Sequence, residues 1–124
     1  MCDNMKNYSM QELAFLGDAI HTLYVRKNIV EKGEIKLNEL NKICSKFCSA
    51  KWQSCICEKL KDLLSEEEFE IVRKARNSKP KHSAKNANPA DYHKATAFEA
   101  LVGWLYLNQK EERLEEILKF SIQE

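Results

Sequence analysis

Residues 13–25 read LAFLGDAIHTLYV, a stretch in which Asp18 is the one charged side chain among residues typical of a buried helix. Its apolar residues recur at helical spacing and form one stripe, which consists of Leu13, Leu16, Ile20, Leu23 and Tyr24. At 100° per residue, Asp18 lies about 200° from Leu16, on the far side of the helix from this stripe. Two interpretations stay open from this helix alone: an ordinary exposed acid, or a carboxylate with a specific partner.

A second apolar stretch repeats the pattern. Residues 95–109 read ATAFEALVGWLYLNQ, and Glu99 is the only charged side chain among them. With Leu101 at 0°, Glu99 lies at about 160° on the helical wheel. Each acid has a glycine nearby in the sequence, Gly17 or Gly103. Isolated buried carboxylates are costly unless they are paired or bind a metal, so two of them on separate helices suggest a divalent-metal site.

Start and stop signals divide the chain into helices. Ser9-Met10-Gln11-Glu12 and Ser65-Glu66-Glu67-Glu68 are capping boxes, and each is expected to begin a helix. Gly33 is expected to end the first helix, and Asn88-Pro89 to begin the helix that carries Glu99.

The rest of the chain completes an all-α prediction. We expect one further helix from about Asn38 to Leu60, a polar loop over residues 77–88, and an amphipathic helix at the C-terminal end. Only three glycines and two prolines are present, too few for the tight turns of an all-β fold. The 124 residues, 44% of them hydrophobic, are expected to form a single domain over residues 1–124.

The same features restrict where the protein acts. No apolar run approaches the ~18 residues that would span a bilayer, and the N-terminal residues show no secretory signal, so we expect a cytoplasmic protein without a membrane partner. The number of cysteines, five, is odd, which argues against a disulfide framework in a chain of this cytosolic character. Cys44, Cys48 and Cys55 would share one face of the predicted long helix, which suits core or interface packing better than a tetrahedral zinc site.

Positive charge is concentrated in one segment. The whole chain carries a formal charge of +1, whereas residues 73–94 carry +6 and the remainder −5. A solvated loop is the simpler interpretation of such a run alone, and a surface that meets a polyanion is the functional one. The candidate phosphate-binding residues are Arg73, Arg76, Lys79, Lys81 and Lys85.

Two motifs carry a resemblance to a known family. Residues 13–19 (LAFLGDA) resemble the signature helix of ribonuclease III domains, and residues 97–103 (AFEALVG) resemble their second conserved helix. The similarity spans nearly the whole chain, and we expect no double-stranded-RNA-binding domain after the second motif. With Arg76-Asn77 before the basic loop and Tyr92 before the second motif, the chain most resembles bacterial mini-ribonuclease III.

The resemblance implies a function. Members of that family are homodimeric, all-helical endonucleases that use Mg²⁺, with Mn²⁺ as a substitute, and cut double-stranded RNA. The implied substrate is the precursor of 23S ribosomal RNA, the implied products carry 5′ phosphate and 3′ hydroxyl ends, and a large-subunit ribosomal protein is an implied partner. Asp18 and Glu99 would be the catalytic residues and metal ligands, and part of the dimer interface would lie on the apolar side of the first helix, near Phe15 and Ile20.

Two departures from the ribonuclease III pattern limit the metal site. Larger members usually carry a further acid one turn before each of the two motif acids, and here those positions hold Ala14 and Thr96. We expect one ion held directly by Asp18 and Glu99, while a second would need phosphate and water ligands. The missing acids favour the main alternative, a non-catalytic helical module that binds RNA or an assembling ribosome. A dimeric protein-interaction domain is a third interpretation, but it explains neither acid.

Overall fold

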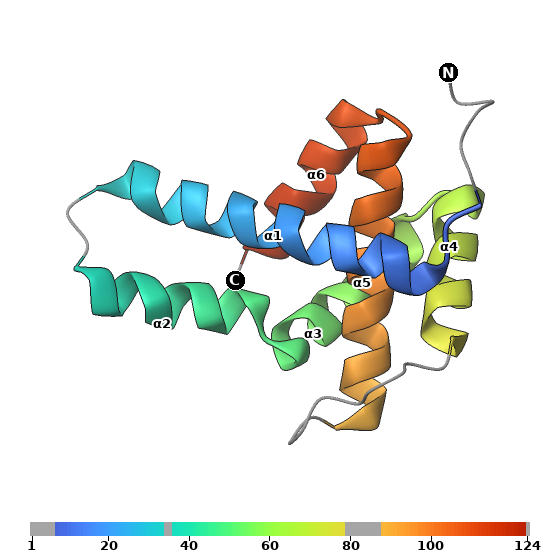
Figure 1. The fold of residues 1–124 in the computed structure, drawn as a ribbon, viewed down its shortest axis with the longest axis horizontal. Helices are drawn as coiled ribbons and strands as arrows, with labels where there is room; N and C mark the ends of the chain where they lie inside the picture. Colours follow the sequence, from blue (N-terminus) through green and yellow to red (C-terminus); the bar gives the residue numbers. More distant parts are fainter. Residues whose placement is uncertain (1–6, 34–35, 79–87, 124) are drawn as a thin grey trace.

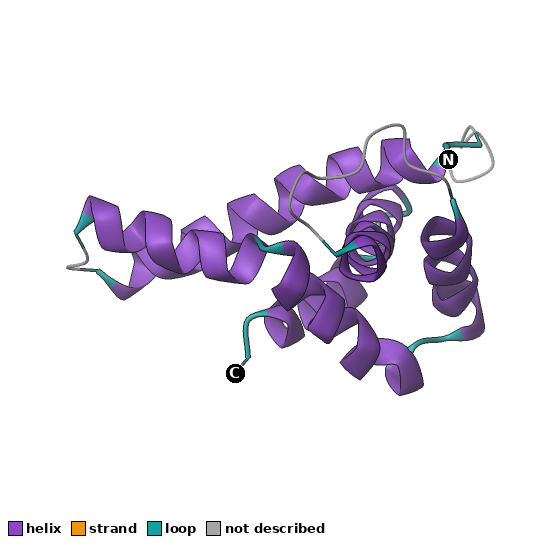
Figure 2. Ribbon diagram, turned by 90° about the horizontal axis from the view of Figure 1, so that it is seen from below, coloured by secondary structure: helices purple, strands orange, loops and turns teal. Residues whose placement is uncertain are grey.

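The computed structural model describes residues 7–33, 36–78 and 88–123, and over these residues the chain forms helices and no strand (Figure 2). The all-α prediction is therefore confirmed. No helix among the described residues is both long and apolar enough to cross a membrane. The helices are α1 (Met10–Lys32), α2 (Leu37–Cys48), α3 (Ala50–Leu60), α4 (Glu66–Asn77), α5 (Pro89–Leu107) and α6 (Glu111–Ser121), with the short 3₁₀ helix η2 (Lys61–Leu63) after α3.

The predicted caps set the helix ends. In the first capping box, the Ser9 hydroxyl accepts a hydrogen bond from the Glu12 amide at 3.0 Å, and the Glu12 carboxylate accepts one from the Ser9 amide at 2.9 Å. Ser65 begins α4 with the same reciprocal pair of bonds. Gly33 ends α1 at φ 73° and ψ 163°, a backbone conformation open almost only to glycine.

The prediction of one helix from Asn38 to Leu60 is wrong, because the chain breaks at Ser49. This residue is extended (φ −70°, ψ 152°), and its hydroxyl accepts from the Trp52 amide at 3.1 Å, so it acts as the N-cap of α3. The break lets α2 run back along α1 as a two-helix arm, while α3 turns towards α5 (Figure 1). The expected cysteine face is shortened as well: Cys44 and Cys48 share a face of α2 with their Sγ atoms 3.9 Å apart, whereas Cys55 is exposed on α3. None of the four described cysteines forms a disulfide.

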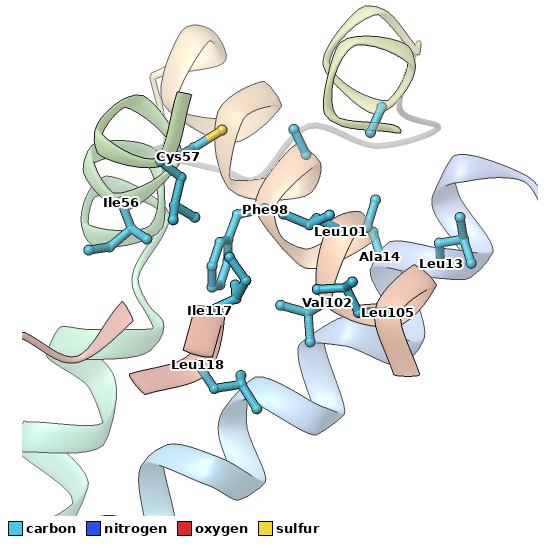
Figure 3. Packing of buried hydrophobic residues seen from close by; sticks show 14 residues of the cluster. Leu13, Ala14, Ile56, Cys57, Phe98, Leu101, Val102, Leu105, Ile117 and Leu118 are labelled. Atoms are coloured by element: carbon cyan, nitrogen blue, oxygen red, sulfur yellow. The ribbon is translucent and has the colours of Figure 1, made fainter. Parts of the chain in front are cut away.

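Helix α5 is the centre of the fold. Figure 2 shows it nearly end-on, with α1, α3 and α4 around it, and it also contacts α6. Its side chains fill the core together with residues from α1, α3 and α6 (Figure 3). Burying each large apolar side chain contributes about 1.5–3 kcal/mol to the free energy of unfolding. The most buried members of α5 are Ala97, Phe98, Ala100, Leu101, Val102 and Leu105.

Helices α1 and α5 touch through glycine. A Cβ atom placed on Gly17 would overlap the backbone carbonyl of Glu99, and one placed on Gly103 would overlap the backbone carbonyl of Leu13. Each helix therefore provides a glycine at the point where the other helix's backbone comes closest. The two glycines, which lie near the two lone acids in the sequence, are the reason why these backbones can approach so closely.

This contact selects an unexpected face of α1. The face that packs in the core consists of small and mixed residues: Leu13, Ala14, Gly17, His21, Val25 and Ile29. The sequence-derived apolar stripe points largely elsewhere, since Leu16 is only half-buried and Leu23 is 69% exposed. A close helix crossing requires small side chains, so the core face is rotated from the apolar stripe towards Gly17: Leu13 is buried, and Ile20 and Tyr24 pack only at its edge.

We predict that Gly17→Ala destabilises the protein by about 3 kcal/mol or more, because the added methyl group meets backbone on the partner helix and no side chain can move aside. Thermal or urea unfolding measures the change. Gly33→Ala is the control: nothing lies within 4 Å of its Cβ position, so its cost is limited to backbone strain of about 1–3 kcal/mol. Equal stability of Gly17→Ala and the unmodified protein would contradict the close crossing.

Candidate active site

The α1–α5 crossing brings the two lone acids together. Asp18 follows Gly17 on α1, Glu99 contributes the carbonyl that faces Gly17, and the two carboxyl groups are within hydrogen-bonding contact. Asp18 is exposed, whereas Glu99 is half-buried. The pair therefore sits at an edge of the core, where one acid is open to solvent and the other is largely withdrawn from it.

Glu99 is held mainly in its protonated form when no cation is present. Burial, the negative charge of Asp18 and a hydrogen bond to Asp18 raise the pKa of Glu99 to about 8, and a hydrogen bond from Gln53 opposes this rise. Two carboxylates in one partly desolvated site cannot both ionise cheaply. Protonation of Glu99 removes the repulsion, and a bound cation would do the same.

The donor set suits a hard divalent cation that keeps much of its hydration. Mg²⁺ binds through one or two carboxylates together with waters and substrate phosphates, and Asp18 and Glu99 supply two carboxylates. Among the described residues no group of three or more acidic, histidine or cysteine side chains could hold an ion. The two positions at which larger ribonuclease III enzymes carry further acids hold Ala14 and Thr96 here, and neither side chain can act as a carboxylate ligand. Ala14 is buried and Thr96 is half-buried.

The two described members of the predicted phosphate-binding set, Arg73 and Arg76, form no ion pair with Asp18 or Glu99 that we find within the described part of the chain. Arg73 is ion-paired with Glu70 one turn earlier on α4. Arg76 lines a groove between α3 and α4, with Lys61 and Lys94 beside it. The other three candidate phosphate-binding residues, Lys79, Lys81 and Lys85, lie outside the described residues.

Sequence reasoning missed Gln53. It is 2% exposed on α3, its amide nitrogen lies 3.1 Å from His21 Nδ1, and it also bonds Glu99. The helical spacing of residues in α3 could have indicated its burial, because Gln53 falls in one stripe with the apolar residues Ile56, Cys57 and Leu60. A polar side chain in such a stripe is buried and needs hydrogen-bond partners.

Comparison with known proteins identifies the family. The sequence model of the ribonuclease III domain family matches residues 11–110. This region contains Asp18 and Glu99 and the two glycines of the helix crossing. The chain belongs to the ribonuclease III family. Membership of this family makes it an endoribonuclease, and the all-α architecture around the α1–α5 crossing is the ribonuclease III fold.

Its relatives span most of its length. A mini-ribonuclease 3 from Brevibacillus brevis is 49% identical over 107 residues, which cover 86% of this chain and 80% of the relative. A mini-ribonuclease 3 from Clostridium tetani is 38% identical over 120 residues, covering 96% and 80%. A crystal structure of a Fusobacterium nucleatum protein superposes with a TM-score of 0.85 at 38% identity and covers 94% of this chain and 93% of that one.

The pKa of Glu99 predicts how the stability of the metal-free protein depends on pH. The folded state binds the Glu99 proton up to about pH 8, whereas the unfolded chain releases it near 4.5, so stability is lost as the pH rises through this range. Burial lowers the pKa of His21 from 6.5 to about 4, so its contribution is instead lost as the pH falls through that range. Stability of the metal-free protein should therefore fall on both the acidic and the alkaline side.

We predict that Glu99→Gln removes the alkaline loss. In EDTA the variant should melt about 5–10 °C above the unmodified protein at pH 9, and the difference should shrink towards pH 5. Adding Mg²⁺ should raise the melting temperature of the unmodified protein and leave that of the variant unchanged. Differential scanning calorimetry measures both effects, with Glu112→Gln on the exposed side of α6 as the control. Parallel pH profiles for the unmodified protein and Glu99→Gln would contradict the assigned burial of Glu99.

Proposed function

We propose that the chain is a divalent-metal-dependent endonuclease of the mini-ribonuclease III type that cuts double-stranded RNA, with Asp18 and Glu99 as its catalytic residues and Mg²⁺ as its ion. The observation that carries this proposal is the contact between two acids from separate helices, inside the segment that matches the ribonuclease III domain. Mn²⁺ shares the preference for oxygen ligands and is expected to substitute.

The chemistry follows from the two carboxylates. Asp18 presents an exposed carboxylate to solvent and substrate, and Glu99 presents a half-buried one. When bound, the ion supplies charge neutralisation at the phosphodiester and an activated water for in-line attack. Asp18 and Glu99 would hold the ion, and its positive charge would favour the ionised form of Glu99. Waters and RNA phosphate oxygens would supply the other ligands.

The precursor of 23S ribosomal RNA is the proposed substrate, as in the mini-ribonuclease III family that the chain resembles. The +6 charge of residues 73–94 supports contact with an RNA backbone, because A-form RNA is recognised mostly through shape and phosphates. Such binding is weak and sensitive to salt. A large-subunit ribosomal protein already on the precursor would compensate for weak intrinsic binding, and a cytoplasmic location follows from this substrate.

A homodimer is the proposed active form, in which each subunit cuts one strand. The support is an apolar surface along α1 that the described chain leaves uncovered, where Phe15 is 84%, Leu23 69% and Val30 64% exposed. An apolar patch of this kind marks a protein interface more often than a free surface. Phe15 and Ile20 stay the candidate contacts, with Ile20 half-buried against the core.

We predict that Asp18→Asn and Glu99→Gln each reduce cleavage at least about 10³-fold, while both variants remain folded and their RNA affinity stays nearly unchanged. The measurement is cleavage of a double-stranded RNA with Mg²⁺ and then with EDTA, accompanied by filter binding. Gln11→Ala on the exposed side of α1 is the control and should cleave normally. Retained cleavage in either acid variant would rule out the two-acid site.

The same assay separates the alternative, a non-catalytic RNA-binding module. The absence of acids at Ala14 and Thr96 favours that alternative, and it predicts RNA binding without Mg²⁺-dependent cleavage. The contact between Asp18 and Glu99 counts against it, because a protein that only binds RNA gains nothing from two costly, converging carboxylates.

We predict that Phe15→Glu converts the dimer into a monomer, because it places a charge in the apolar surface of α1. Sedimentation equilibrium should show the lower mass, and double-strand cleavage should fall with it. Leu63→Ser is the matched control: Leu63 is 57% exposed on η2, away from α1, and its substitution should leave the mass unchanged. A monomeric unmodified protein that cuts both strands would contradict the dimer.

A further inference from the structure

A chain of buried hydrogen bonds leads from Glu99 through the interior to the C-terminal helix. Glu99 on α5 bonds Gln53 on α3, Gln53 bonds His21 on α1 at 3.1 Å, and His21 bonds Ser121 on α6 at 3.0 Å. Gln53 is 2% exposed, and both His21 and Ser121 are fully buried. Four helices therefore meet in one polar chain beside the candidate active site.

The direction of each bond follows from the proton inventory. The Ser121 hydroxyl donates its one proton to the Leu118 carbonyl at 2.6 Å, so its oxygen accepts from His21 Nε2. The neutral His21 ring then has an unprotonated Nδ1, which accepts from the Gln53 amide. An amide NH₂ carries two protons, so Gln53 can donate one to His21 and one to Glu99.

The ends of this chain are anchored. The His21 ring packs edge-on against Phe98, the residue before Glu99, with ring centroids 5.0 Å apart. The indole of Trp52, the residue before Gln53, donates to the Ser121 carbonyl at 2.6 Å. The Gln53 amide consequently has little freedom to turn, and neither has the carboxyl group that it contacts.

We propose that Gln53 is a positioning residue for the nuclease reaction: its amide, oriented by His21, fixes the direction of the Glu99 carboxylate for binding the divalent ion. This inference rests on the proposed function. Gln53 would touch neither substrate nor ion, and it would act through Glu99. Partners that hydrogen-bond a metal-ligating side chain typically change metal affinity or activity by about 10–100-fold when they are removed.

The simpler explanation is that Gln53 serves only as a hydrogen-bond donor to the buried His21. That role would need a single hydrogen bond, from the Gln53 amide to His21 Nδ1, and Gln53 would then matter for stability alone. The second bond, to Glu99, is what separates the two explanations, because it predicts an effect on metal binding in a protein that remains folded.

The test uses Gln53→Met, which keeps the length and volume of the side chain and removes the amide. Since this variant leaves His21 without a donor, the double variant His21→Phe/Gln53→Met is a second arm, in which both partners become apolar and the stability cost is smaller. Ser54→Ala is the matched control: Ser54 is also buried on α3 and loses a 2.8 Å bond, but to Asp91. Melting curves verify that each variant is folded.

Two readouts are measured on the full-length chain. Electron paramagnetic resonance of Mn²⁺ gives the dissociation constant without RNA, and single-turnover cleavage at saturating RNA gives the rate as Mg²⁺ is titrated. Gln53→Met and the double variant should bind Mn²⁺ about 10-fold more weakly and cleave about 10–100-fold more slowly at low Mg²⁺, with partial recovery at high Mg²⁺. RNA affinity should stay within about 2-fold, and Ser54→Ala should match the unmodified protein.

The outcomes separate this inference from the proposed function. Unmodified Mn²⁺ affinity and cleavage in both Gln53 variants would overturn the positioning role while leaving Asp18 and Glu99 as the catalytic pair. An equal loss in Ser54→Ala would also overturn it, because any buried bond of α3 would then matter. If the unmodified protein does not cleave RNA, the proposed function fails, and the Mn²⁺ affinities still decide whether Gln53 supports Glu99.

Discussion

The close contact between α1 and α5 is the constraint on which the rest of the structure depends. Backbone meets backbone at Gly17 and Gly103, so neither helix can shift or rotate without a collision or a void. The same contact fixes which face of α1 is buried and places the residue after Gly17 beside Glu99. Core packing and site geometry are thus consequences of one crossing, and a substitution at either glycine affects both.

The crossing places the acids together at a cost in stability. Burial of Glu99 beside Asp18 raises the pKa of Glu99 to about 8. The metal-free protein is therefore less stable at the alkaline pH values at which this carboxyl group ionises. Functional sites often carry such a cost, because a group that is poised for a ligand is poorly satisfied without it. A cation bound between the two acids would make the ionised pair favourable, and its binding would then be linked to folding stability.

The sequence predicted the helix ends better than the packing. Ser9, Ser65 and Gly33 act through bonds to their own backbone neighbourhood, and such local signals can be read without the fold. The break at Ser49 was also locally encoded, but the absence of glycine and proline hid it. The buried face of α1 and the role of Gln53 depend on which helices meet. The two acids were found only because each was the lone charge in an apolar stretch.

The absent acid at Ala14 has a physical meaning in this fold. Ala14 is 7% exposed and belongs to the hydrophobic core, so a carboxylate there would be desolvated and would add negative charge near Glu99, whose pKa is already raised by burial and by the charge of Asp18. A small apolar residue avoids that cost and suits the close crossing. The site then relies on neutral donors rather than on further charge to hold its buried carboxylate. Gln53, held by the neutral imidazole of His21, is such a donor, and it serves Glu99 without adding charge.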